Sequence, residues 1–468
     1  MRFVVTLVIC LVAVTAQPSA AQRPASGRAV PGKAPATLAL VGGMLLDGYE
    51  TPPVHHAAVL VEGNKIVWVG RAADVKIPAG AKVIDTSGRV MMPGLWEMHA
   101  HLNLIGHGNY ARWFPWMREH NMEPRVMAIS AKQFIDAGIT SAVDLGSPLE
   151  TIVALRKDIE SGKVVGPRLT LSGPMMRRGR ELIPGQGPIE TPADAARTAE
   201  ALVAGGADIL KMQEGGFTVE HYKAVVEVAK KHKKQTHAHV YFPEAVQAAL
   251  DARIDVLQHA GSGGTPPYSA EIMKQIVDRA VPVCPTVAHR VSLFKDNAAF
   301  PERLQDPQLR EDFGPQIFEE VQASLTDWHR VPYFEPLIGI GDTPRQVFFG
   351  ERGSITQWIT SGAVVVMGTD SGTPSNFNTE ALWREIKVFV DYGMKPIKAI
   401  SAATRVAARV MGRGDELGTI EPGKLADIIV IKGDPLYDIQ AMADVEVVIK
   451  DGVVLKDPTT RSTSVAAR

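Results

Sequence analysis

The sequence contains two histidines separated by a single residue, His99 and His101, in an apolar stretch. In a β-strand, side chains two positions apart point to the same face, so both imidazoles could bind one cation. The pair alone is weak evidence, because a histidine in a strand is more often a hydrogen-bonded core residue or a surface residue. Its significance depends on which other polar groups gather beside it.

Four more residues that could bind a metal or transfer a proton follow strand-like runs later in the chain. They are Lys211, His239, His259 and Asp370. Like His99 and His101, each lies at or just beyond the end of its run. Barrel enzymes have their active sites at the carboxyl ends of the parallel strands. We therefore expect the six residues to meet at one rim and to bind one or two divalent cations.

The strand-like runs that position these residues alternate with helix-like segments from residue 91 to residue 412. Such alternation is typical of βα units and of a parallel sheet. The eight runs are 95–99, 141–145, 168–171, 208–211, 235–239, 255–259, 281–284 and 363–368. Helices are predicted at 125–137, 191–204, 218–231 and 243–252. The predicted fold is therefore α/β, a (β/α)8 TIM barrel.

One stretch of this region, 288–361, is too long for a single crossover. We expect it to include a helical cap over the mouth of the barrel.

Short β-rich runs flank this region at both ends of the chain, in residues 36–90 and 413–458. The first set resembles antiparallel sheet. Neither set would bury much apolar surface alone, so we expect the two to pair into one small composite β-sandwich.

The N-terminus has the features of a cleaved export signal over residues 1–21. Arg2 precedes an apolar run, and small residues stand at Ser19 and Ala21. The run is shorter than the roughly 20 residues that span a bilayer, so no membrane span is expected in the mature protein. Residues 22–35 and 459–468 are predicted to be a flexible leader and tail. A periplasmic or secreted location follows.

Composition excludes several classes of protein. Lys and Arg total 50 and Asp and Glu total 51, so the chain has no basic excess for binding nucleic acid. Hydrophobic residues make up 45%, which is ordinary for a globular protein. The mature chain would keep only Cys284, so no disulfide framework is expected, and this cysteine is interpreted as a small buried apolar residue.

Three segments resemble signatures of the amidohydrolase superfamily. Residues 92–101, Met-Pro-Gly-Leu-Trp-Glu-Met-His-Ala-His, resemble its first strand, and Gly368-Thr-Asp-Ser resembles its eighth. Residues 418–430 are similar to the start of its C-terminal sandwich. The resemblance covers nearly all of the mature chain and is closest to the imidazolonepropionase-like and Xaa-Pro dipeptidase-like branch. It implies a metal-dependent hydrolase of C–N bonds that acts on a small molecule or a dipeptide.

The resemblance also implies roles for the rim residues. Lys211 would be carboxylated and would bridge two cations, with Asp370 on the first and His239 and His259 on the second. A free ammonium has no lone pair for a cation, whereas a carbamate offers two anionic oxygens. Two Zn²⁺ ions are expected, although Mn, Co or Fe would suit the same groups. The alternatives are an unmodified Lys211 or a site with a single metal.

Further roles follow from the same resemblance. Asp370 would act as the general acid and base. Tyr241 would contact the substrate; otherwise it is an aromatic packed at the rim. His239 is preferred to His237 as the ligand, because its 20-residue spacing to His259 matches the family, although both face the same way.

Arg178, in the loop after the third run, could bind a substrate carboxylate through two hydrogen bonds. Charged runs of this kind are more often only solvated.

Two other functions remain open at this level. A deaminase of the same superfamily is one, although such enzymes usually use a single metal, which the apparent bridging lysine argues against. A non-catalytic periplasmic binding protein on the same barrel is the other. The oligomeric state stays open between a monomer and a homo-oligomer.

Overall fold

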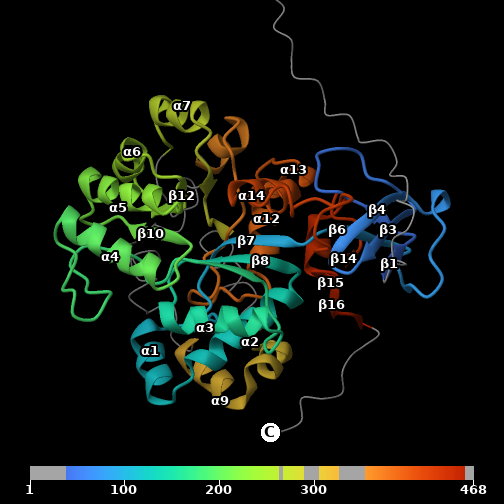
Figure 1. Ribbon diagram of the computed structural model, residues 1–468, viewed down its shortest axis with the longest axis horizontal. Coiled ribbons are helices and arrows are strands. Elements are labelled where there is room, and N and C mark those ends of the chain that lie inside the picture. Colours follow the sequence, from blue (N-terminus) through green and yellow to red (C-terminus); the bar gives the residue numbers. More distant parts are fainter. Residues whose placement is uncertain (1–37, 263–266, 289–304, 326–353, 459–468) are drawn as a thin grey trace, which may run out of the picture.

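A computed structural model describes residues 38–262, 267–288, 305–325 and 354–458 (Figure 1). The predicted export signal, leader and tail lie outside these residues, as do residues 289–304 and 326–353 of the predicted cap. Within the described part, no helix combines the length and the apolar character needed to cross a membrane.

The central part of the chain contains seven parallel strands in two sheets, ordered β7-β8-β9 and β10-β11-β12-β13. They correspond to the first seven predicted runs. The strands are β7 (Leu95–Ala100), β8 (Ile139–Asp144), β9 (Arg168–Leu171), β10 (Ile209–Gln213), β11 (Gln235–His239), β12 (Val256–Gln258) and β13 (Val283–Cys284). Most of their residues are buried on both faces, as expected where helices cover a parallel sheet.

Isolated backbone bridges connect the two sheets to each other and to the segment after residue 362. These bridges join Met176 with Met212, Val283 with Val365, and Ala100 with Ser371. The predicted eighth strand, 363–368, is not a strand in the structure, although its backbone is paired. Val283 donates to the Val364 carbonyl at 2.9 Å and accepts from Val366 N–H at 3.0 Å. The two-residue strand β13 offers only a short ladder. On the other side the bonds to β7 are scattered, with Met98 N–H donating to the Met367 carbonyl at 3.1 Å and Asp370 N–H to the His99 carbonyl at 2.8 Å.

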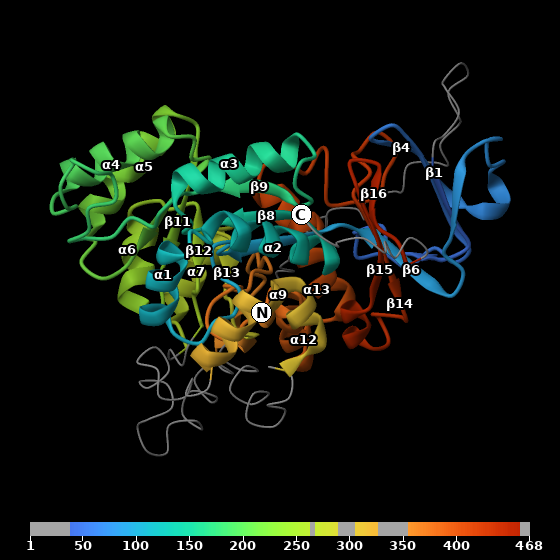
Figure 2. The same ribbon diagram turned by 90° about the horizontal axis from the view of Figure 1, so that it is seen from below.

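Helices follow the strands and pack against them (Figures 1 and 2). The four predicted helices appear within two residues of their predicted bounds, as α2, α4, α5 and α6. Helix α4 starts where sequence chemistry predicts, because Thr191 and Asp194 form a reciprocal capping box. The helices are α1 (Tyr110–Glu119), α2 (Glu123–Asp136), α3 (Leu149–Glu160), α4 (Pro192–Ala204), α5 (Val219–Lys231), α6 (Pro243–Asp251), α7 (Ala270–Asp278), α9 (Pro307–Leu325), α12 (Ala381–Asp391), α13 (Pro396–Ala402) and α14 (Arg405–Val410).

The described part of the predicted cap contains α9. This helix shares an apolar cluster with α1 and α2 through side chains that include Trp113, Val126 and Phe313.

The two ends of the chain contribute strands that lie side by side, blue beside red in Figure 1. One sheet has the order β4-β3-β1-β5 and the other β16-β15-β14-β6-β2. Strand β6 from the N-terminal part pairs with β14 from the C-terminal part, with Met92 opposite Ile429. The strands are β1 (Leu38–Val41), β2 (Met44–Leu45), β3 (Ala57–Glu62), β4 (Lys65–Arg71), β5 (Lys82–Asp85), β6 (Arg89–Pro93), β14 (Ile428–Lys432), β15 (Val445–Lys450) and β16 (Val453–Lys456).

An apolar cluster takes side chains from both of these sheets, among them Leu40, Val59, Val430 and Val447. The predicted antiparallel pairing is wrong in part, because β5 pairs with β1, and β2 with β6, in parallel. In this sheet the β3–β4 hairpin occupies one side of β1, and β5 pairs on the other side.

Candidate metal centre

Five of the six predicted ligands lie at or just beyond the carboxyl ends of the central strands, whereas Lys211 is the middle residue of β10. His99 is near the end of β7 and His101 directly follows it. His239 is the last residue of β11, and His259 follows β12. The remaining two, Lys211 and Asp370, lie on β10 and just beyond the paired segment 363–368.

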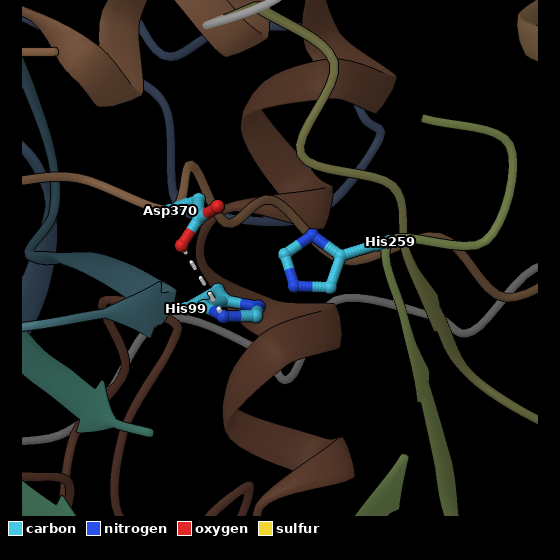
Figure 3. A group of neighbouring side chains, drawn as sticks. All are labelled: His99, His259 and Asp370. Carbon is cyan, nitrogen blue, oxygen red and sulfur yellow. Dashed lines mark ion pairs between the residues drawn. The ribbon is translucent and has the colours of Figure 1, made fainter. Parts of the chain in front are cut away.

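Three of these residues approach one another closely enough to share a cation (Figure 3). Asp370 Oδ1 lies 3.6 Å from His99 Nε2 and 2.9 Å from His101 Nε2. One donor atom from each of His99, His259 and Asp370 falls within 4.8 Å of the other two. Two ligands of a tetrahedral Zn²⁺ lie roughly 3.4 Å apart, given metal–ligand distances near 2.1 Å. These side chains therefore need only small movements to coordinate one ion.

His239 and Tyr241 border the same group of rings. The His239 ring centroid lies 4.1 Å from that of His259, and the Tyr241 ring stands perpendicular to His239 at 4.7 Å. Two hydrogen bonds fix the Tyr241 backbone, one to Glu214 Oε2 at 2.9 Å and one from the Tyr268 hydroxyl at 2.8 Å. The Tyr241 ring thus lies against the rings of His239 and His259.

The backbone at two of the six positions has an uncommon conformation. His259 and Asp370 have φ values of 64° and 59°, in the left-handed region that Asn, Asp and His adopt more often than other L-residues. Thr286, whose hydroxyl lies 2.7 Å from His259 Nδ1, also has a positive φ of 53°. Such conformations cluster at active sites because the surrounding structure enforces them.

Lys211 is fully buried, and its Nζ has no hydrogen-bond partner among the residues that the structure describes. Burial lowers the pKa of Lys211 to about 7, although the Asp370 carboxylate opposes this change. A buried ammonium without a partner is costly, so the site favours a neutral amine or a modified lysine. This orphaned atom is consistent with a carboxylated side chain.

Gln258 contacts two of the histidines and was missed by sequence reasoning, because glutamine is not a usual metal ligand. Its Oε1 lies 2.8 Å from His99 Nδ1, and its Nε2 lies 3.0 Å from His237 Nδ1. Burial lowers the pKa of His99 well below its usual value, so its ring is neutral. With Nδ1 donating to the glutamine oxygen, the lone pair of His99 resides on Nε2, which faces Asp370.

Glu97 is a second buried residue that sequence reasoning missed. Its carboxyl group accepts hydrogen bonds from the backbone N–H groups of His99 and Thr369, both at 2.9 Å, and from the Thr369 hydroxyl at 2.8 Å. Burial raises the pKa of Glu97 to about 8. The period-two spacing of Glu97, His99 and His101 could have indicated an inward side chain. Glu97 therefore ties β7 to the segment that bears Asp370.

A sequence profile of the amidohydrolase family matches residues 90–292 and 346–455, about two thirds of the chain. The chain belongs to the amidohydrolase family. The family is metal-dependent, and its members related to this chain are hydrolases of C–N bonds. The protein is therefore an enzyme of that class. Family membership thus favours a hydrolase over the alternative of a non-catalytic binding protein.

Individual relatives of this amidohydrolase have diverse activities. Imidazolonepropionase of Streptomyces griseus is 23% identical over 439 residues, covering 87% of this chain and 92% of the relative. The 5-methylthioadenosine/S-adenosylhomocysteine deaminase of Symbiobacterium thermophilum is 23% identical over 464 residues, covering 89% and 93%. The crystal structure of a Xaa-Pro dipeptidase with bound methionine superposes with a TM-score of 0.71 at 24% identity, covering 90% of this chain and 99% of that one. The last comparison establishes a shared fold.

Arg178 of the amidohydrolase lies in the loop between β9 and α4 and is half exposed. Its Nε is 3.2 Å from Glu190 Oε2, and its aliphatic part lies against Gly216. The carboxylate that Arg178 contacts in this structure is therefore one of the protein's own.

A cavity of about 710 Å³ lies at the opposite, amino ends of the strands. Two of its arginines are paired with carboxylates of the protein, since Arg168 contacts Asp427 and Asp451 and Arg156 contacts Asp208. It is distinct from the cluster of histidines at the carboxyl ends.

Proposed function

We propose that this amidohydrolase is an exported enzyme that hydrolyses an amide, peptide or cyclic-amide bond, with a dipeptide among the candidate substrates. The observation that carries the proposal is the convergence of His99, His101, His259 and Asp370 at one end of the central strands. Residues of these types at that position suit water-dependent cleavage of a C–N bond.

The proposal includes a (β/α)8 barrel as the catalytic domain, with a composite β-sandwich beside it. Backbone pairing supports the barrel, because it passes from β7 through β13 to Val365 and returns from Ser371 to Ala100 on β7. The sheet that contains both β6 and β14, and the apolar cluster shared with the other sheet, support the sandwich.

The donor set suits one or two divalent cations, with Zn²⁺ expected from its nitrogen and oxygen atoms. His99, His101 and Asp370 would hold one cation and His239 and His259 a second, with carboxylated Lys211 between them. When bound, the cations supply Lewis acidity, which lowers the pKa of a water molecule and polarises the scissile carbonyl. The low pKa of Lys211 supports carboxylation, since only the unprotonated amine can react with CO₂.

Asp370 would accept the proton of the attacking water on a carboxylate oxygen and deliver it to the leaving nitrogen. Its backbone is held for this task. The Asp370 carbonyl accepts hydrogen bonds from Thr373 Oγ1 at 2.6 Å and from Asn376 Nδ2 at 3.1 Å. Tyr241, next to His239 and His259, would contact the substrate.

Deamination is the second candidate. The chain is 23% identical to the deaminase of Symbiobacterium thermophilum and also 23% identical to imidazolonepropionase of Streptomyces griseus. The buried Lys211 amine, which has no partner in the part of the chain that the structure describes, favours the hydrolase with two metals, since a mononuclear deaminase needs no bridging carbamate.

Zinc-loaded enzyme should be tested on N-acyl amino acids, Xaa-Pro and Xaa-Arg dipeptides and lactams, with ammonia release from aminopurines measured in parallel. Two metals per chain and hydrolysis of an amide are expected, and Lys211→Arg should lower the metal content and abolish turnover. Ammonia release with a single metal would replace this proposal with deamination. For export, mass spectrometry of protein from the periplasm or medium should show a mature chain that starts near Gln22.

A further inference from the structure

Two buried nitrogen atoms on neighbouring strands of the centre have no hydrogen-bond partner among the described residues. Lys211 on β10 and His237 on β11 are direct partners in the parallel register, so their side chains leave neighbouring strands toward the same face. Lys211 Nζ and His237 Nε2 are both buried, and neither has a hydrogen-bond partner in the described parts of the chain. The two atoms therefore do not bond each other, and a polar group that fits between them would satisfy both.

Gln258 determines which ring nitrogen of His237 carries the proton. Its Nε2 lies 3.3 Å from the Met98 carbonyl oxygen and 3.0 Å from His237 Nδ1. A carbonyl oxygen can only accept, so the amide nitrogen, not the amide oxygen, must lie on this side. The second amide hydrogen then points to His237 Nδ1, which must accept it. The ring is consequently neutral, with its proton on Nε2.

The same amide gives His99 the opposite role. Gln258 Oε1, on the other side of the amide, accepts from His99 Nδ1 and leaves the lone pair on His99 Nε2. A lone pair suits a metal ligand, and an N–H group suits a donor to an anion. His237 therefore has no ring lone pair to offer a cation, because Nδ1 is occupied and Nε2 is protonated.

We propose that His237 is a positioning residue whose Nε2–H donates a hydrogen bond to a carbamate oxygen on Lys211. The inference rests on the carboxylated lysine of the proposed function. In the modification, the lone pair of neutral Nζ attacks the carbon of dissolved CO₂ and forms the N–C bond. One C–O π pair moves to oxygen, and Nζ loses one proton to solvent. The product offers anionic oxygens to a site that otherwise holds two donors.

A hydrogen bond to a charged group corresponds to roughly a 10- to 100-fold change in an equilibrium constant. Removal of the His237 donor should therefore raise the bicarbonate concentration needed for half-carboxylation of Lys211 by about that factor. The variant should bind CO₂ at Lys211 and the second metal less tightly. Both effects can be measured without any substrate.

The test compares His237→Leu, which has no donor, with His237→Gln, whose side-chain amide keeps an N–H group. Each protein is equilibrated with ¹³C-bicarbonate and zinc, and the carbamate resonance is followed by ¹³C NMR together with zinc content. Lys211→Arg identifies the resonance by removing it, and thermal unfolding verifies that each variant is folded. We expect His237→Gln to keep the carbamate resonance and the second zinc. In His237→Leu we expect half-carboxylation to need about 10- to 100-fold more bicarbonate, and the content of the second zinc to fall with it.

A second measurement needs no variant. Ring ¹⁵N NMR of the wild-type protein should show His237 protonated on Nε2, and a proton on Nδ1 would overturn the inference. Wild-type carbamate occupancy in folded His237→Leu would overturn it too, while leaving the proposed hydrolase intact. No carbamate resonance in the wild-type protein, at saturating bicarbonate and zinc, would overturn the bridging lysine of the proposed function and this inference with it.

Discussion

Replacement of Gly368 by alanine should disturb the metal centre although it changes none of the side chains proposed to bind the cations. An added Cβ would lie 2.5 Å from Cys284 Sγ, 2.7 Å from the backbone N of His99 and 2.9 Å from the carbonyl carbon of Met98. The sulfur could yield, but the other two atoms belong to the backbone of β7. At Gly368 the Asp370 segment therefore packs directly against the backbone of β7.

The displacement can be worked out from these distances. Ordinary contact for a Cβ begins at 3.4 Å, so the segment must move by 0.7 Å (3.4 − 2.7) from His99 N. Asp370 is two residues further on and would move by a similar amount. Functional groups tolerate about 0.5 Å of misplacement, and about 1 Å can cost 100-fold in rate. Overpacking should also lower the free energy of unfolding by about 1–3 kcal/mol.

The primary assay is competition with a chromophoric chelator, in which Gly368→Ala should show a lower zinc affinity than the wild-type protein. Measurements of kcat/KM and of urea unfolding accompany it. Gly414→Ala is the control, because its Cβ would meet Arg409 Cγ, on a long side chain that can move, at 2.8 Å. Addition of Cys284→Ala to Gly368→Ala should restore function only in part, since the backbone contacts remain. Wild-type zinc affinity and stability in Gly368→Ala would refute the reasoning.

Three further predictions concern single side chains. Asp370→Asn should keep its fold and lose at least about 100-fold in kcat, because the proton acceptor is gone; near-normal turnover would reject its assignment. Burial lowers the pKa of His107 to about 3, so the folded state resists protonation and stability is lost as pH falls below the unfolded value of 6.5. His107 should contribute about 2 kcal/mol to the stability lost between pH 8 and pH 5, so urea unfolding should show a loss smaller by about that amount in His107→Phe; the same loss in both proteins would contradict this. Arg178→Ala should raise KM for carboxylated substrates by at most about five-fold, because exposed pairs such as that with Glu190 contribute about 1 kcal/mol or less; no rise would remove Arg178 from the site.

Local patterns in the sequence predicted the positions of most elements. Seven of the eight parallel runs and the four named helices appear where alternation and apolar spacing placed them. Those patterns depend on burial of neighbouring residues, which is a property of a short stretch of chain. The predicted strand at 363–368 failed because a strand requires a continuous ladder, whereas this segment has a short pairing with the two-residue β13 and scattered hydrogen bonds to β7.

The sequence by itself determined which side chains end the strands, and that common end is where His99, His101 and Asp370 meet. Only the tertiary structure decided what each of them can do. Gln258 contacts His99 across 159 positions of sequence, and Glu97 contacts Thr369 across 272. A histidine's proton, and hence its choice between ligand and donor, depends on such distant partners. No local spacing encodes them, because chain folding alone brings those atoms within hydrogen-bond distance.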